Sequence, residues 1–161
     1  MIKWFVLAVS MLALPATAHG DDDRRPNPPR RECNERQIRN RSAEQVLVSH
    51  RAALASGDWN TVACNYTPNA VVVTDGGVIE GRENTVSALQ QLSALFGGTI
   101  PMVNEEVIVS ILNDRAEMAR VLFSLTTPCV DINDGADTYI IKNGRITAQT
   151  AHGFPTFKCA P

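Results

Sequence analysis

Helical and strand periodicities occupy different parts of this chain, and their order limits the folds open to it. Apolar residues recur at helical spacing over about 43–56, in a second short helix through Tyr66, and over about 82–96. From residue 107 onward the pattern changes to the alternation that is typical of strands. Helices separated from a run of long strands indicate an α+β fold with a mostly antiparallel sheet.

Two turn signals predict hairpins. Asp75-Gly76-Gly77 separates short strands at 71–74 and 78–80, and Asn143-Gly144 is a strong two-residue turn signal inside the last pair of strands. A curved, mixed sheet wrapped around a long third helix, with two helices before it, would form a cone with an apolar pocket.

The N-terminus has the features of a secretory signal over residues 1–18. Lys3 precedes an apolar run, and Ala16-Thr17-Ala18 fits the small-x-small cleavage rule. The run is shorter than the roughly 20 residues that span a bilayer as a helix, which favours cleavage over a membrane anchor. Residues 19–32 are charged and proline-rich and predict a disordered leader. We expect a secreted or periplasmic protein, free of the membrane after cleavage, whose domain covers 33–161.

Charge and cysteine content exclude several classes of protein. Lys and Arg number 15 and Asp and Glu 17, so no basic field is present and no nucleic-acid partner is expected. The even number of cysteines in an exported chain predicts two disulfides. No Cys-x-x-Cys spacing occurs, and the histidines do not cluster near the cysteines, so no metal site is expected. The four cysteines are Cys33, Cys64, Cys129 and Cys159.

Several short motifs resemble SnoaL-like domains of the nuclear-transport-factor-2-like superfamily. The resemblance rests on segments 55–59, 65–73, 77–82, 137–146 and 149–150, in that order. It implies the cone fold, usually as a homodimer, with a pocket lined by the first helix and the concave sheet. Such relatives include cyclases, isomerases, dehydratases, epoxide hydrolases and binding modules, so the resemblance implies no single reaction.

The expected fold favours one pairing of the cysteines. The first two helices would run roughly antiparallel, which brings Cys33 near Cys64. The loop before the closing hairpin holds Cys129 and would lie at the same end of the sheet as the segment leading to Cys159. The main alternative joins Cys33 to Cys159 and Cys64 to Cys129, which would clasp the two tails together.

The register of the closing hairpin suggests an inward-facing carboxylate. Counting back from Asn143-Gly144 pairs Tyr139 with Ala148 and Asp137 with Thr150. The face that holds Tyr139 is the more apolar one, so we assign it to the interior, with Thr150 and His152 beside the carboxylate. A carboxylate in an apolar pocket would have a raised pKa and could act as acid or base. A structural hydrogen bond to Thr150 is the alternative. The opposite face, with Thr138, Ile140, Thr147 and Gln149, is the expected homodimer interface.

His50 lies on the apolar face of the first helix, either as a core group or as a proton-transfer group against the pocket. Tyr66 could donate a hydrogen bond to a ligand carbonyl. The expected ligand contacts are Tyr66, Phe123, Tyr139, Thr150 and His152.

Three functions remain open. The favoured one is binding of a small, largely apolar molecule, or of a partner, in the cone. The alternative is a cofactor-independent lyase, isomerase or cyclase that uses Asp137 and His50 as an acid–base pair. The third is a structural protein whose pocket is filled by its own side chains. No cofactor is expected for any of them.

Overall fold

The computed structural model describes residues 33–101, 103–113 and 116–159, so the predicted signal and leader lie outside the described residues. The helices are α1 (Glu35–Ile38), α2 (Ala43–Ser56), α3 (Trp59–Asn65) and α4 (Arg82–Leu95). The strands are β1 (Tyr66–Thr74), β2 (Gly77–Glu80), β3 (Val103–Asn113), β4 (Ala116–Thr126), β5 (Val130–Lys142), β6 (Arg145–His152) and β7 (Pro155–Phe157).

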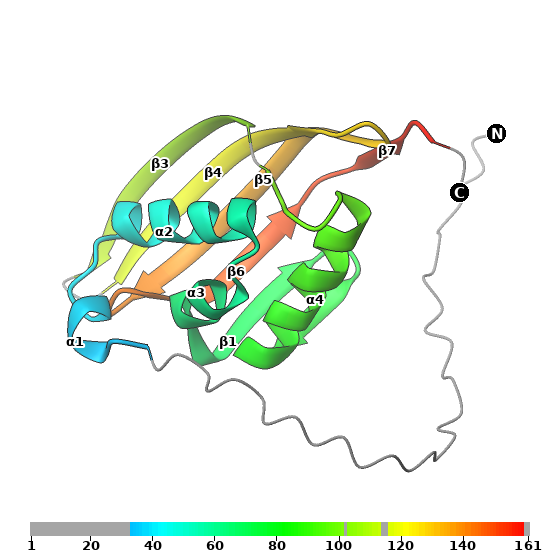
Figure 1. Cartoon of the computed structure of the whole chain (residues 1–161). Coiled ribbons are helices and arrows are strands. Elements are labelled where there is room, and N and C mark those ends of the chain that lie inside the picture. The colour runs from blue at the N-terminus through cyan, green and yellow to red at the C-terminus, as the bar shows by residue number, and fades with distance from the viewer. Residues whose placement is uncertain (1–32, 102, 114–115, 160–161) are drawn as a thin grey trace, which may run out of the picture.

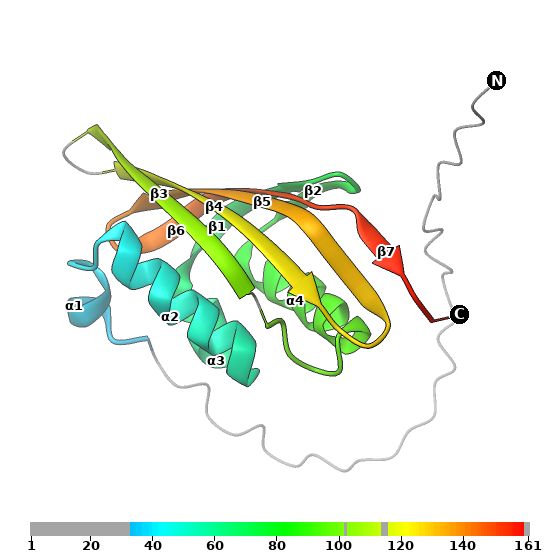
Figure 2. The same ribbon diagram turned by 90° about the horizontal axis from the view of Figure 1, so that it is seen from above.

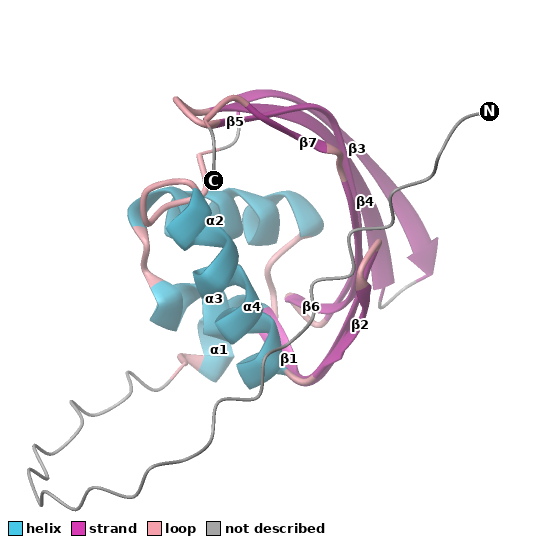
Figure 3. Ribbon diagram, turned by 90° about the vertical axis from the view of Figure 1, so that its right-hand side faces the viewer, coloured by secondary structure: helices cyan, strands magenta, loops and turns pink. Residues whose placement is uncertain are grey.

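The strands form one mixed sheet in the order β2-β1-β6-β5-β4-β3, and β7 pairs with β5 beyond the end of β6. Among the described strand pairs only β1 and β6 run parallel, and all the others are antiparallel. The long connection between β1 and β6 contains β2, α4 and the strands β3 to β5. The sheet is curved, and the helices lie against its concave side (Figures 1 and 3). The predicted α+β class with a mostly antiparallel sheet is confirmed.

Two helices of equal length share the concave face, where the sequence had suggested one long helix. Both α2 and α4 have 14 residues. Helix α2 packs against β4 and α4 packs against β1 and β2, and a view from above shows both helices on the same side of the sheet (Figure 2). A full capping box between Ser42 and Gln45 starts α2, and Gly57 ends it with a φ of 69°. Asp58 then caps α3 through the backbone N–H of Thr61. Within the described ranges no helix is long and apolar enough to cross a membrane.

Both disulfides have the favoured pairing. Cys33 is bonded to Cys64 with 5.6 Å between the Cα atoms, and Cys129 to Cys159 with 4.8 Å. The first bond ties the segment before α1 to α3, and the second ties the β4–β5 turn to the residues after β7. The clasp of the two tails through Cys33 and Cys159 is therefore excluded.

The closing hairpin differs from the predicted register by one residue. Ile141 pairs with Ile146 as expected, but Ile140 pairs with Ala148 and Tyr139 with Gln149. Thr147 is the extra residue of a β-bulge, and its hydroxyl donates to the carbonyl of Ile140 at 3.1 Å. Because neighbouring side chains point to opposite faces, every residue of β6 after the bulge changes face.

Candidate functional site

A cavity of about 340 Å³ lies between the helices and the concave sheet. This volume is near the lower end of the range for small-molecule sites. Its walls come from α2, α4, the segment after α4, and strands β4 to β7. They are mainly aliphatic or aromatic: Leu54, Leu89, Leu92, Leu95, Phe96, Ile100, Phe123, Leu125, Val130, Ile132, Ala151, Pro155 and Phe157.

Five hydrogen-bonded residues, here called the polar floor, stand at the buried end of the cavity: His50, Tyr66, Asp137, Tyr139 and Gln149. All of them are at most 5% exposed. All but Tyr66 line the cavity directly, and the Tyr66 side chain lies behind them. The floor is thus a polar group at the end of an apolar chamber.

Separate elements deliver these side chains to one place. His50 is on the buried face of α2, and the alternation of β5 points Asp137 and Tyr139 inward. The bulge at Thr147 turns Gln149 to the same side. Tyr66 stands where α3 becomes β1.

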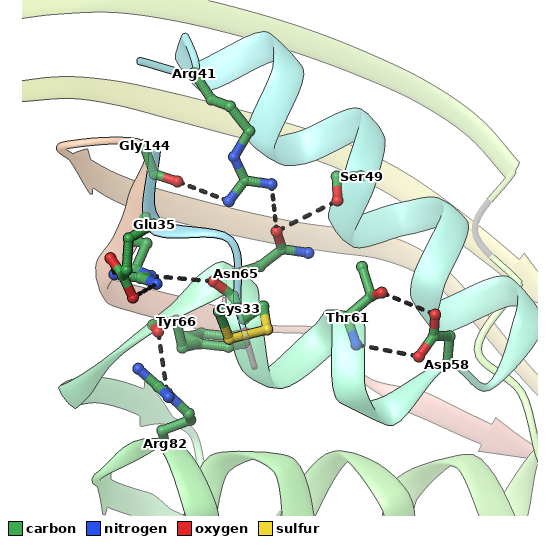
Figure 4. The surroundings of a disulfide bond; sticks show 12 residues. Cys33, Glu35, Arg41, Ser49, Asp58, Thr61, Asn65, Tyr66, Arg82 and Gly144 are labelled. Carbon is green, nitrogen blue, oxygen red and sulfur yellow. Dashed lines mark hydrogen bonds and ion pairs between the residues drawn. A yellow bond between two sulfur atoms is a disulfide. The ribbon is translucent and has the colours of Figure 1, made fainter. Parts of the chain in front are cut away.

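Arginine side chains hold the junction that carries Tyr66 (Figure 4). Arg82 Nε donates to the carbonyl of Tyr66 at 3.1 Å, and Arg145 Nε donates to the carbonyl of Cys64 at 3.2 Å. Arg41 reaches both the side chain of Asn65 and the carbonyl of Gly144, at 2.8 Å each. The bonds from Arg82 and Arg145 satisfy carbonyls at the end of α3, and so help to fix the start of β1.

The floor forms one connected hydrogen-bond network. Tyr139 donates to Asp137 Oδ2 at 2.7 Å, and Gln149 Nε2 donates to the same oxygen at 3.2 Å. The hydroxyl of Tyr66 donates to Gln149 Oε1 at 2.5 Å and lies 3.4 Å from His50 Nε2. His50 and Asp137 are therefore linked through Tyr66 and Gln149.

Burial shifts the two titratable groups in opposite senses. It raises the pKa of Asp137 to about 6, although the hydrogen bonds from Tyr139 and Gln149 act to lower it. It lowers the pKa of His50 to about 4, because the buried imidazolium has lost its hydration. The pKa values of Tyr66 and Tyr139 are raised by burial and then by the charge of Asp137. Near neutral pH the floor therefore holds an ionised carboxylate and a neutral imidazole.

The structure brings together most, but not all, of the predicted site residues. His50, Asp137, Tyr139 and Phe123 line the cavity, and His152 lines its rim. At the rim, His152 Nδ1 lies 2.9 Å from a carboxylate oxygen of Asp75, and both side chains are about half exposed.

Thr150 is a correction, because the bulge places it on the outer face, opposite Thr138, where it is exposed. For the same reason Gln149, assigned to the outer face from the sequence, is buried in the floor. The only signal for Gln149 was its place in the Gln149-Thr150 motif. Tyr66 donates its hydrogen to Gln149, not into the cavity.

The C-terminal strand closes one side of the cavity mouth. Pro155 and Phe157 of β7 contribute to the lining, and β7 pairs with Val130–Ile132 of β5. The disulfide Cys129–Cys159 and an ion pair of 2.8 Å between Lys158 and Asp131 fasten this strand. We call residues 155–159 the strap.

Metal-binding geometry is absent from the described part of the chain, where no three His, Cys, Asp or Glu side chains are grouped to hold an ion. The floor offers one carboxylate and a tyrosine–glutamine–histidine network, which suits hydrogen bonding and proton transfer.

Solved structures with this arrangement of helices and sheet include NTF2-like proteins. An NTF-2-like protein of unknown function from Shewanella oneidensis MR-1 is 17% identical, with a TM-score of 0.56 over 68% of this chain and 94% of that one. One from Burkholderia xenovorans LB400 is 18% identical, with a TM-score of 0.52 over 73% of this chain and 86% of that one. This chain has the NTF2-like fold. No family model matches it.

Two other similarities of this chain differ in how much of each protein they cover. An LEH-like epoxide hydrolase from M. tuberculosis is 16% identical, with a TM-score of 0.51 over 68% of this chain and 80% of that one. In sequence, 77 residues are 31% identical to a 2,3-bisphosphoglycerate-independent phosphoglycerate mutase of Vibrio parahaemolyticus, which is 48% of this chain. The match spans only 15% of the mutase, so it carries no function to this chain.

Proposed function

We propose that this protein is a SnoaL-like member of the superfamily that binds a small, largely apolar molecule in its cone. The observation that carries the proposal is a cavity of about 340 Å³ with apolar walls and one buried carboxylate at its end. Cavities of this kind, with few polar groups, are typical of small-molecule sites. The unfilled volume argues against a structural protein whose own side chains occupy the pocket.

Binding to a naphthalene-based probe tests this proposal. We expect 2-naphthol, followed by its fluorescence, to bind saturably with one site per chain. Ala151→Trp would place an indole in the cavity and should abolish binding. Val48→Trp adds the same group to an exposed position of α2, where the native side chain is 59% exposed, and should leave binding unchanged. Thermal unfolding of both variants checks that they are folded. Absence of saturable binding, or equal loss in both folded variants, would contradict the proposal.

A second candidate is proton-transfer catalysis by a cofactor-independent lyase, isomerase or cyclase. The observation that favours it is that both hydrogen bonds to Asp137 end on Oδ2, so Oδ1 is available to a ligand. In this mechanism Oδ1 takes a proton from an acidic C–H bond, and the electron pair stays on the ligand. Return of the proton to another carbon would complete an isomerisation, and loss of a leaving group would complete an elimination. His50, with a lowered pKa, would act as a neutral hydrogen-bond partner and not as the acid.

Hydrogen–deuterium exchange tests the catalytic candidate. A cyclic ketone in D₂O should exchange its α-hydrogens faster with the native protein than in buffer, as followed by NMR. The rate should rise as Asp137 ionises around pH 6. Exchange at the buffer rate, or an undiminished rate in Asp137→Asn, would rule out Asp137 as the base.

We also propose export and dimer formation. Two disulfides are typical of oxidising compartments, which supports the predicted signal. An intact mass that corresponds to a chain starting at His19 would establish cleavage.

The homodimer would use the outer face of the sheet, around Thr138, Ile140 and Thr147. Gln149 is no longer part of this proposed interface, because its side chain is buried in the floor. Sedimentation as a monomer at micromolar concentration would contradict it.

A further inference from the structure

The hydrogen atoms of the polar floor can be assigned one by one when Asp137 is ionised. A separation of 2.5 Å between Tyr66 Oη and Gln149 Oε1 requires a hydrogen between them, and the amide oxygen has none. Tyr66 therefore donates to Gln149. Its only hydrogen is then used, so the contact of 3.4 Å with His50 Nε2 requires the hydrogen to be on the imidazole.

This assignment also determines where the amide nitrogen of Gln149 points. With Oε1 toward Tyr66, Nε2 points to Asp137 Oδ2 and donates to it at 3.2 Å. Tyr139 donates its one hydrogen to the same oxygen. His50 Nδ1 then has no hydrogen, which agrees with its being buried without a hydrogen-bond partner among the described residues. Every hydroxyl and imidazole hydrogen of the floor is thus used within the floor.

The main group of the polar floor that stays free to bind a ligand is a hydrogen-bond acceptor. Asp137 Oδ1 takes part in neither bond, and the second hydrogen on Gln149 Nε2 is the remaining donor. No Lys or Arg side chain lines the described cavity to balance the carboxylate. A ligand hydroxyl could donate to Oδ1 and accept from Gln149. A carbonyl, ether or carboxylate oxygen would leave Oδ1 without a hydrogen-bond donor in a cavity with mainly apolar walls.

We infer that the molecule bound here has an apolar body and presents a hydrogen-bond donor, a hydroxyl or an ammonium group, to Oδ1 of Asp137. This inference rests on the proposed binding function and narrows its ligand class. It separates alcohols, phenols and hydrophobic amines from ketones, ethers and acids of the same shape. The sequence prediction that Tyr66 donates to a ligand carbonyl has no place in this arrangement.

Probes with one aromatic body and different polar groups test the inference. We expect 2-naphthol and 2-naphthylmethylammonium to bind the native protein roughly tenfold or more tightly than 2-methoxynaphthalene and 2-naphthoate, because only the first two can pair with Oδ1. In Asp137→Asn this preference should shrink to a few-fold, since the amide can accept or donate. Asp75→Asn removes a carboxylate from the rim and should keep the full preference.

The outcomes distinguish the proposed binding function from the inference about the ligand's hydrogen-bond donor. Binding of 2-methoxynaphthalene or 2-naphthoate as tight as that of 2-naphthol would overturn the inference and leave the binding function standing. A preference unchanged in Asp137→Asn, or lost in Asp75→Asn, would also overturn it, because the donor would then pair elsewhere. Failure of all four probes to bind would refute the binding function and the inference together.

Discussion

The two buried titratable groups make opposite contributions to the pH dependence of stability. Asp137 has a raised pKa, so the native state binds its proton more tightly than the unfolded chain. Its stabilisation is full below about pH 3.8 and is lost as pH rises through about 6. His50 has a lowered pKa, so the unfolded chain binds the proton more tightly. Stability is therefore lost as pH falls from 6.5 through about 4.

The sizes of these contributions follow from the pKa values. At 1.36 kcal/mol for each pKa unit, each group changes the free energy of unfolding by about 3 kcal/mol over its whole range. Between pH 4 and 6 each changes it by about 2 kcal/mol, with opposite sign. In the native protein the two contributions nearly cancel there, so each becomes visible only when the other is removed.

Urea denaturation at pH 4, 5, 6 and 7 measures this cancellation. Relative to the native protein, Asp137→Asn should gain about 2 kcal/mol as pH rises from 4 to 6, because only the His50 contribution remains. His50→Gln should lose about 2 kcal/mol over the same interval. The double variant is the control, and its pH profile should run parallel to the native one. If both single variants also ran parallel to the native protein, the assignment of two oppositely shifted buried groups would be wrong.

Three further predictions concern the surroundings of the site. Gly144→Ala should destabilise the protein by roughly 3 kcal/mol or more in urea, because its φ is 68° and a Cβ would overlap a backbone carbonyl of α1. Gly97→Ala, with φ 86° but open space around it, should cost about 1 kcal/mol. Replacing Cys129 and Cys159 by alanine should cost about 3 kcal/mol and release 2-naphthol several-fold faster, because the strap loses its bond; an unchanged rate in stopped-flow would show that the strap does not retain ligand. Gln149→Leu should raise the pKa of Asp137 further in an NMR titration, because a bond that lowers it is removed.

The parts of the fold that local rules determine were predictable. The start of α2 is set by contacts among neighbouring residues, so its capping box could be recognised from Ser42 and Gln45 alone. The Asn143-Gly144 turn likewise needs no distant partner, and both its residues have positive φ. The expected order of helices and strands favoured the correct disulfide pairing over its main alternative. Each bond joins two segments whose ends that order places close together.

The sequence predictions failed where the structure depends on a contact between distant residues or on a single irregularity in a strand. Strand alternation has a period of two, so the single extra residue at Thr147 reversed the face of Gln149 and Thr150. Nothing in the local sequence marks that bulge. Helix α1 is too short for periodicity to reveal, and it is held by a distant ion pair of 2.7 Å between Glu35 and Arg145. The sequence indicated four members of the polar floor, which are His50, Tyr66, Asp137 and Tyr139. It did not indicate Gln149, which joins Tyr66 to Asp137.

The spacing of the disulfides has a consequence for how the chain matures. Each bond joins one cysteine to the next along the sequence, with separations of 31 and 30 residues. Synthesis proceeds from the N-terminus, so Cys64 becomes available to Cys33 while Cys129 is still to be made. Cys129 in turn meets Cys159 after the first pair has been used. Oxidation in the order in which the cysteines are synthesised would therefore give the native pairing without exchange of mispaired bonds.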